Sequence, residues 1–245
     1  EAMNHMVNLM REHIPSDTRI HYVITEGGKA PNVVPDYAEV YYYARHPKRD
    51  VLAGIFERIK KAAEGAALGT ETRVEVEIIN GVYDLLPNEP LARLMHTNLE
   101  QVGGVTYTPE EIEFGRKIQQ SLIGSSPDIS TASRVDPFNP VAQGSGGSTD
   151  VGDISYVVPT VGLVTATWIP GVPAHSWQAV ACGGTDIGIK GMMVAAKTLA
   201  LTGLDLLNDP VHIQQALQDY QKRLGPNFKY TALIGDRKPP LDYRN

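Results

Sequence analysis

Along the first eighty residues, the spacing of hydrophobic positions switches between a helical period and a two-residue period. Residues 1–14 follow a helical period, with one apolar face made of Met3, Met6, Val7, Met10 and Ile14. Residues 19–25 and 38–45 alternate as half-buried strands and are separated by a loop rich in glycine and proline. A helix that Asp50 caps and that Gly69 ends follows, and residues 72–78 alternate again. This order predicts an α+β sandwich with its helices on one face of an antiparallel sheet.

From Asn88 onward, helix signals replace strand patterns. Helices are predicted from Asn88 to Gly103, after the capping box at residues 108–111, from 185 to 207 and from 209 to 224. The clearest strand pattern in this half is the apolar run 161–168. Several helices beside one or two strands make an unbalanced unit, so we expect further chain to complete its sheet.

The change of pattern near residues 81–87 predicts two domains, 1–81 and 82–245, in a chain of the α/β class. The first helical pattern starts at Glu1 without a preceding Ser, Thr, Asp or Asn to cap it. We interpret this opening as a sign that the sequence is part of a longer protein.

Composition narrows the kinds of partner. The 245 residues are 42% hydrophobic and 20% charged, which is typical of a soluble globular protein. The net charge of -6 is spread without a basic stripe, so nucleic acid and membrane surfaces are poor candidates. No apolar run suggests a membrane span or a signal peptide. The single cysteine, Cys182, excludes an internal disulfide and suits a reducing compartment, so we expect a cytoplasmic protein.

The stretch 143–178 carries the candidate chemistry. It holds a glycine-rich loop, the carboxylates Asp150 and Asp153, and a second loop that contains His175. Carboxylates near an imidazole suit either a metal ion or an oriented histidine. The alternative is equally open from these residues alone: Asp150 caps a helix and His175 is an ordinary hydrogen-bonded loop histidine.

Four segments carry a resemblance to a known family: HYVITEGGKAPNVVPDYAEVYYYAR, AEGAALGTET, GSTDVGDISYVVPT and PAHSWQ. Together they resemble the dinuclear-zinc amidohydrolases and carboxypeptidases, a family that includes aminoacylase and carboxypeptidase G, and most closely its aminobenzoyl-glutamate hydrolase branch. The resemblance spans nearly the whole chain and is weakest at 125–143 and after Asn227. It implies a dimerisation domain at 1–81 and the C-terminal part of an α/β zinc-hydrolase catalytic domain at 82–245.

The resemblance also implies roles for particular residues. His175 matches the family's last metal ligand, and Asn32 and Arg45 match a pair that reaches the partner subunit's active site. There an asparagine amide stabilises the developing oxyanion and an arginine binds a substrate carboxylate. The residues given supporting or substrate-contacting roles in the glycine-rich loop are Thr149, Asp150 and Asp153. The alternatives are that Asn32 only completes a turn and that Arg45 is a solvated surface residue.

The activity implied by the resemblance is hydrolysis of an amide between an acyl or aryl group and an amino acid. Two zinc ions per site are expected in the full-length protein, where zinc activates water and a carboxylate moves the proton. Most metal ligands and the general base would lie outside this sequence, so we expect the chain alone to be inactive. We expect a homodimer that acts on a small amide or dipeptide-like substrate. The alternatives are a non-catalytic dimerisation module and a remnant that folds poorly.

Overall fold

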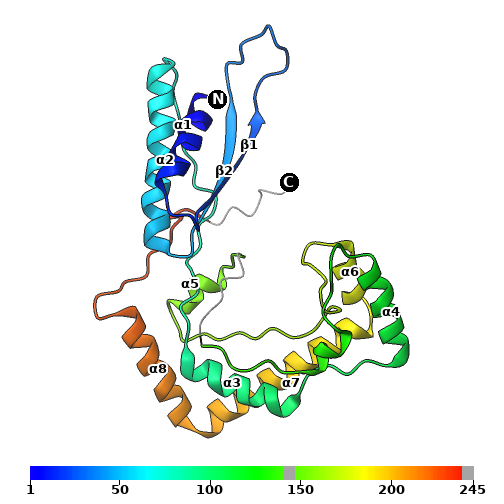
Figure 1. Ribbon diagram of the computed structural model, residues 1–245. Helices are drawn as coiled ribbons and strands as arrows, with labels where there is room; N and C mark the ends of the chain where they lie inside the picture. Colours follow the sequence, from blue (N-terminus) through cyan, green and yellow to red (C-terminus); the bar gives the residue numbers. More distant parts are fainter. Residues whose placement is uncertain (141–146, 239–245) are drawn as a thin grey trace. The chain divides into compact units, whose positions relative to one another are not determined.

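The computed structural model describes residues 1–140 and 147–238, which form two compact units (Figure 1). Unit 1 comprises residues 1–85, 144–153 and 231–245, as far as they are described, and unit 2 comprises 86–143 and 154–230. Each unit has its own hydrophobic core. The mixture of helices with a small sheet agrees with the α/β class, while the domain boundary at 81/82 stays a prediction.

Unit 1 is built on an antiparallel hairpin. Strand β1 (Arg19–Glu26) pairs with β2 (Glu39–Arg45), and the register sets Arg19 opposite Arg45 and Ile24 opposite Val40. The strands predicted at 19–25 and 38–45 are therefore confirmed. The helices of this unit are α1 (Ala2–Met10), the short 3-10 helix η1 (Arg11–His13) and α2 (Arg49–Gly69).

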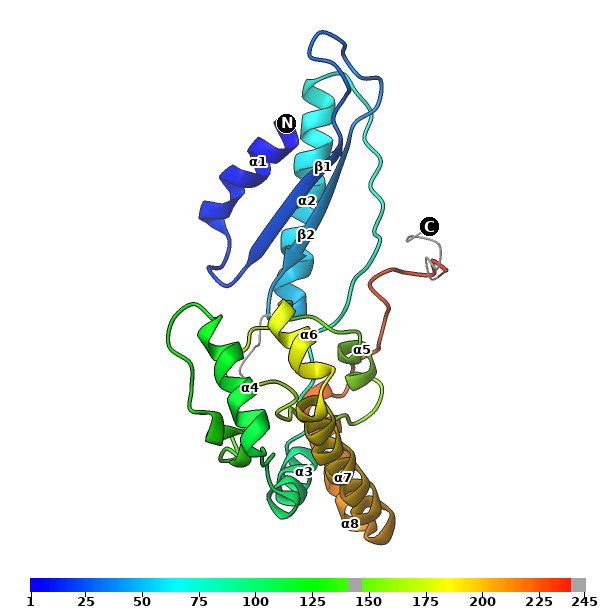
Figure 2. The same ribbon diagram turned by 90° about the vertical axis from the view of Figure 1, so that its right-hand side faces the viewer.

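Helices α1 and α2 cover one face of the hairpin (Figures 1 and 2). The buried core between these layers consists of Val7, Met10, Ile20, Ile55, Ile59 and Ala62. On the same face, the rings of Tyr22 and Tyr42 stack with centroids 5.2 Å apart, and the Tyr42 hydroxyl donates to the buried side chain of Asn4. The stripe predicted for α1 was wrong at Met6, which is exposed, because the helix turns Asn4 inward to meet Tyr42.

Two other expectations for unit 1 were wrong. Residues 72–78 form no strand: among the described residues the sheet contains only β1 and β2, and a strand needs a neighbour to accept its backbone hydrogen bonds. The N-cap of α2 is Lys48, and Asp50 lies in the first turn. There its carboxylate accepts hydrogen bonds from the Arg49 guanidinium.

Unit 2 is mainly helical. Helix α7 packs against α3, α6 and α8, and α3 also packs against α8. Helix α5 spans the division between the units. The elements are α3 (Glu89–Val102), α4 (Pro109–Gln120), η2 (Ile129–Ser133), α5 (Val151–Ser155), α6 (Trp177–Gly183), α7 (Asp186–Asn208) and α8 (Pro210–Leu224). The four helices predicted in this half are confirmed.

Capping and buried amides hold these helices together. The predicted capping box is present at Thr108 and Glu111. The Asn88 side chain accepts from the Leu91 amide and donates to the Ala216 carbonyl at 2.8 Å, which ties the start of α3 to α8. Similarly, the buried Asn98 amide donates to the Asp205 carboxylate at 2.7 Å and ties α3 to α7.

The apolar run 161–168 forms no strand either. It lies against α7 as an extended segment in which the Thr165 hydroxyl donates to the Gly191 carbonyl at 2.9 Å. A Cβ atom at Gly191 would come within 2.4 Å of the Ala166 carbonyl oxygen, so this close approach requires glycine. Contact with a helix satisfies a few backbone groups, whereas a strand needs a ladder partner, and the described residues supply none here.

Helix α7 differs from the expectation that no run is long and apolar enough to span a membrane. Its 23 residues, with a mean hydropathy of 1.3, meet that criterion by length and composition. The observation is weak evidence for a membrane, because core helices of soluble proteins pass the same test. The contacts of α7 with three other helices are those of a packed helix.

We predict that Asn88→Ala lowers the free energy of unfolding more than Asp209→Ala, as measured by urea denaturation of the chain. Both substitutions remove an N-cap, which costs about 1 kcal/mol. Asn88→Ala also leaves the buried carbonyl of Ala216 without its donor, which adds about 1–3 kcal/mol. Equal effects of the two substitutions would contradict this role of the Asn88 amide.

Candidate functional site

His175 lies at the mouth of a pocket in unit 2. It occupies the turn before α6, and its side chain is exposed. The pocket has a volume of about 550 Å³ and is lined by Trp168, Ala174, His175, Ser176, Trp177, Ala179 and Val180. An imidazole and two indole rings around one opening can bind a flat or apolar group beside a hydrogen-bonding nitrogen.

The backbone of this turn holds His175 in an uncommon conformation. Its φ angle of 60° lies in the left-handed region, where histidine occurs more often than most residues but still at a cost. Ser176 fixes the turn on the other side: its hydroxyl donates to the Pro173 carbonyl at 2.7 Å and accepts from the Ala179 amide at 3.1 Å. The imidazole is therefore presented by a defined turn.

The candidates in the glycine-rich loop lie at the start of α5. The Thr149 hydroxyl accepts from the Val151 amide at 3.3 Å, and Asp150 is exposed. The Asp153 carboxylate accepts from the Tyr83 amide at 3.1 Å. A Cβ atom at Gly152 would come within 2.0 Å of the Tyr83 carbonyl oxygen, so the two segments are in close contact. Asp153 therefore joins α5 to the chain that enters unit 2, whatever else it does.

Asn32 and Arg45 lie at different ends of the β1–β2 hairpin. Asn32 is in the exposed loop that connects the strands, and Arg45 is the last residue of β2, opposite Arg19 at the far end. Seven residues of strand separate that loop from the end of β2, or about 20 Å at the usual rise per residue. The Arg45 guanidinium lies 5.7 Å from the centre of the Tyr43 ring. Joint action of Asn32 and Arg45 on one substrate stays a prediction.

The described residues do not fit a dinuclear zinc site. Across 1–140 and 147–238, no group of three or more His, Cys, Asp or Glu side chains comes together. A catalytic zinc takes three protein ligands, so His175 alone cannot hold one.

Sequence reasoning did not find the surroundings of His175. Trp168 and Trp177 line its pocket, although each lies within ten residues of it in the sequence. Their proximity along the chain is a signal that could have been used, because aromatic residues near a candidate histidine often form the wall of a binding site. A larger cavity beside α4 carried no such signal and is described below.

Comparison with known proteins identifies the class. Residues 1–71 match the family model of the M20 peptidase dimerisation domain. The chain belongs to the M20 peptidase family, as the resemblance in the sequence indicated.

Two kinds of characterised relative cover most of the chain. It is 35% identical to a subunit of the p-aminobenzoyl-glutamate hydrolase of Escherichia coli over 88% of its length and 50% of that protein's. It is 27% and 25% identical to the Xaa-Arg dipeptidases of Mus musculus and Homo sapiens, over 89% of the chain in each case and over 44% and 43% of those proteins. The chain therefore spans about half the length of these curated relatives, which their names describe as hydrolases.

We predict an inverted order of stability at position 175. Glycine normally destabilises folded structure relative to alanine, but at a φ angle of 60° it avoids a cost of about 1–2 kcal/mol that alanine pays. His175→Gly should therefore have a higher free energy of unfolding than His175→Ala in urea titrations. The usual order, with alanine more stable, would mean that the turn does not hold this conformation.

Proposed function

We propose that the chain forms part of a zinc-dependent amidohydrolase that cleaves N-acyl or N-aroyl amino acids, with aminobenzoyl-glutamate as the leading candidate substrate. The observation that carries the proposal is the match of residues 1–71 to a peptidase dimerisation domain, combined with 35% identity to an aminobenzoyl-glutamate hydrolase over 88% of the chain. The Xaa-Arg dipeptidases support the same reaction class, since they too cleave an amide next to an amino acid by name.

Self-association through unit 1 is part of this proposal. The distal half of the hairpin and its loop expose apolar side chains, of which Val34 is 92% exposed. The exposed set is Tyr22, Val23, Ile24, Val33, Val34 and Tyr37. Apolar residues gathered on one surface are typical of an interface, and a two-fold dimer would bury the same surface on each copy of the chain.

The rest of the catalytic apparatus is proposed to lie elsewhere in the full-length protein. The chain spans about half of its relatives, and unit 2 exposes apolar side chains such as Val164 and Val180. Further chain packed on this surface would cover it and could supply the general base and most metal ligands. In this proposal His175 contributes one ligand, and Thr149, Asp150 and Asp153 support the same site.

Arg45 is proposed to select the acid end of the substrate, and Asn32 to stabilise the oxyanion. A guanidinium can hold a carboxylate through two parallel hydrogen bonds, which suits an acyl-glutamate or dipeptide-like substrate. Arg45 is exposed at the end of β2 and lies beside an aromatic ring, so a ligand can reach it. Because it belongs to the dimerisation domain, we propose that it serves the partner subunit's site.

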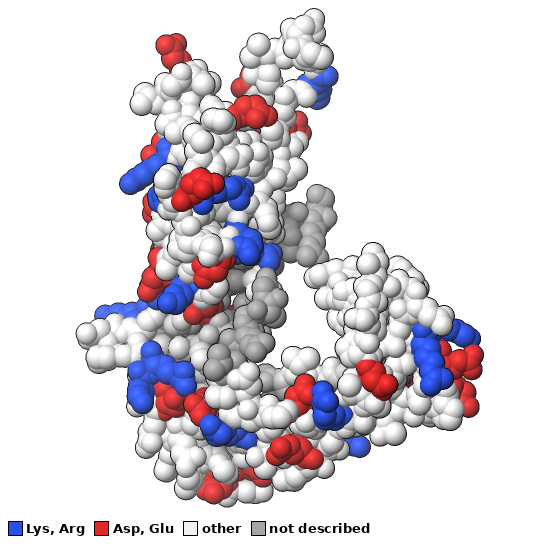
Figure 3. Space-filling view, viewed as in Figure 1, with Lys and Arg blue, Asp and Glu red and all other residues white. Residues whose placement is uncertain are grey.

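The surface charge supports a small-molecule or protein partner. On the face drawn in Figure 3, Lys and Arg are interspersed with Asp and Glu over both units, and the net charge of the chain is -6. Nucleic acid and anionic membrane would require a concentrated basic surface, so neither is part of the proposal. A cytoplasmic location also belongs to the proposal, in keeping with the single, buried Cys182.

A non-catalytic association module is the second candidate. It is favoured by the metal donors of the described residues, which do not converge on one point. The name of the bacterial relative is also relevant, because it describes that protein as one subunit of a hydrolase. In this case the chain would still self-associate but would bind its partner without hydrolysing an amide.

We predict that Arg45→Gln in the full-length protein raises KM for aminobenzoyl-glutamate at least ~10-fold, since a lost charged hydrogen bond costs about 1.5–3 kcal/mol. Arg19→Gln is the matched control, because it removes the same charge directly opposite in the ladder. Steady-state assays on both variants, with thermal melts to verify folding, provide the test. An unchanged KM in Arg45→Gln would remove Arg45 from the site.

We also predict that the 245-residue chain supplied with zinc hydrolyses aminobenzoyl-glutamate no faster than a protein-free blank, while the full-length protein with zinc does so readily. The reason is that His175 lacks companion ligands among the described residues. Release of aminobenzoate, followed by chromatography, measures both rates. Activity of the short chain would contradict the division of the site, and inactivity of both forms would favour the association module.

A further inference from the structure

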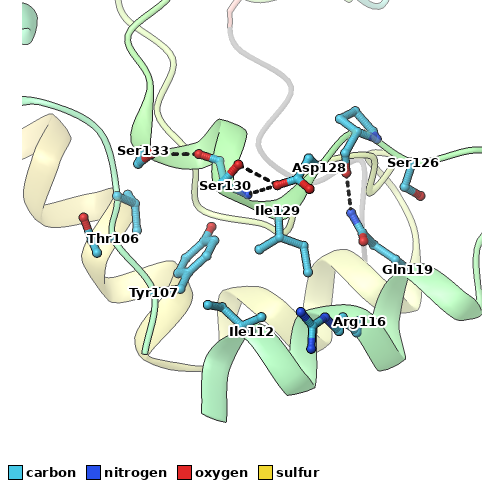
Figure 4. Close-up of a pocket in the computed structure, with 12 residues that line it drawn as sticks. Thr106, Tyr107, Ile112, Arg116, Gln119, Ser126, Asp128, Ile129, Ser130 and Ser133 are labelled. Carbon is cyan, nitrogen blue, oxygen red and sulfur yellow. Dashed lines mark hydrogen bonds between the residues drawn. The ribbon is translucent and has the colours of Figure 1, made fainter. Parts of the chain in front are cut away.

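A second, larger cavity lies in unit 2, between α4 and the segment 126–133 (Figure 4). Its volume is about 650 Å³, which is within the usual range of about 300–1,000 Å³ for small-molecule sites. Arg116 and Ile112 line it from α4, and Asp128 and Ile129 line it from the facing segment, as Figure 4 shows. None of the residues discussed in the proposed function belongs to this cavity.

Tyr107 gives the first indication that the cavity takes a polar ligand. Its hydroxyl oxygen is buried and has no hydrogen-bond partner among the described residues. Burial raises the pKa of this hydroxyl to about 12, so it stays protonated and remains a donor at neutral pH. Buried polar groups are normally hydrogen-bonded, and an exception at the wall of a cavity suggests that a ligand supplies the missing acceptor.

Asp128 provides a fixed negative charge. Its Oδ1 atom accepts hydrogen bonds from the Ser130 amide at 2.8 Å and from the Ser130 hydroxyl at 2.5 Å. These bonds, with a smaller contribution from the charge of Arg116, hold the pKa of the Asp128 carboxyl below its usual range. Both recorded bonds fall on Oδ1, so the Oδ2 oxygen can accept from a ligand.

Arg116 provides the opposite charge. It projects from α4, is exposed, and lines the cavity without a hydrogen bond or ion pair to any described side chain. The next residue along α4, Lys117, instead pairs with Glu113 at 2.9 Å and does not line the cavity. The guanidinium is therefore placed to bind a carboxylate, for which its planar fork is suited.

We propose that this cavity binds the zwitterion of a small amino acid with an aliphatic side chain. The carboxylate would bind Arg116 and accept from the Tyr107 hydroxyl, and the ammonium group would donate to Asp128. The aliphatic side chain would pack on the apolar part of the wall, formed by Val105, Ile112 and Ile129.

The two charges select the ligand class. A simple carboxylate would meet the repulsion of Asp128, and a simple amine would meet that of Arg116, so each lone charge is disfavoured. A zwitterion satisfies both. The cavity thus recognises a free amino acid, which is independent of whether the full-length protein hydrolyses an amide.

Isothermal titration of the 245-residue chain with three ligands of one carbon skeleton tests the proposal. L-leucine carries both charges, 4-methylpentanoate only the carboxylate, and 3-methylbutylamine only the ammonium group. We expect saturable binding of L-leucine that is at least ~10-fold tighter than binding of either analogue. No saturable binding of L-leucine, or equal binding of 4-methylpentanoate, would overturn the proposal.

Three substitutions locate the binding. Arg116→Gln, Asp128→Asn and Tyr107→Phe should each weaken L-leucine binding ~10-fold, and the control Lys117→Gln should leave it unchanged. Asp128→Asn keeps an oxygen for the Ser130 bonds, and Tyr107→Phe removes only an unpaired hydroxyl, so its melting temperature should equal or exceed that of the wild type. Leucine binding that survives all three substitutions would place the ligand elsewhere.

Discussion

The ladder between β1 and β2 is the interaction on which unit 1 depends. It aligns Ile20 with the helices that cover it, so that α1 and α2 can bury one face of the hairpin. The ladder also carries Arg45 to one end of the unit and the loop with Asn32 to the other. Since each strand has one partner among the described residues, the hairpin keeps an outer edge on both sides. Open edges and exposed apolar side chains are features that association commonly covers.

Unit 2 is organised by buried amide groups between helices. Asn88 and Asn98 hold α3 against α8 and α7, and each is fully engaged in hydrogen bonds where a lone polar group would be costly. This scaffold supports two different openings. One surrounds His175 with indole rings, and the other sets opposite charges around a buried hydroxyl. The first is connected with the proposed hydrolysis, and the second is not.

Local signals in the sequence predicted much of the fold. The helices from Asn88, from Thr108 and from Asp209 were found because caps act within one turn and need no distant partner. The two hairpin strands were found because alternation and a short connection suffice. The runs 72–78 and 161–168 carry similar patterns but form no strand, since a ladder also needs a neighbour that the described residues do not supply.

The candidate site was predictable only in part. The turn at His175 follows from its local sequence, whereas the inward turn of Asn4 required the distant Tyr42, and the cavity beside α4 required residues separated by more than twenty positions. The family resemblance reached further than patterns did, because it supplied roles for residues that lie far apart in the chain, such as Asn32 and His175.

Self-association of this chain is the central claim, and sedimentation velocity at micromolar concentrations tests it most directly. The account predicts a species of twice the 26.7 kDa mass of the chain, with the dimer fraction rising with concentration. A single 26.7 kDa species over the whole concentration range would contradict it.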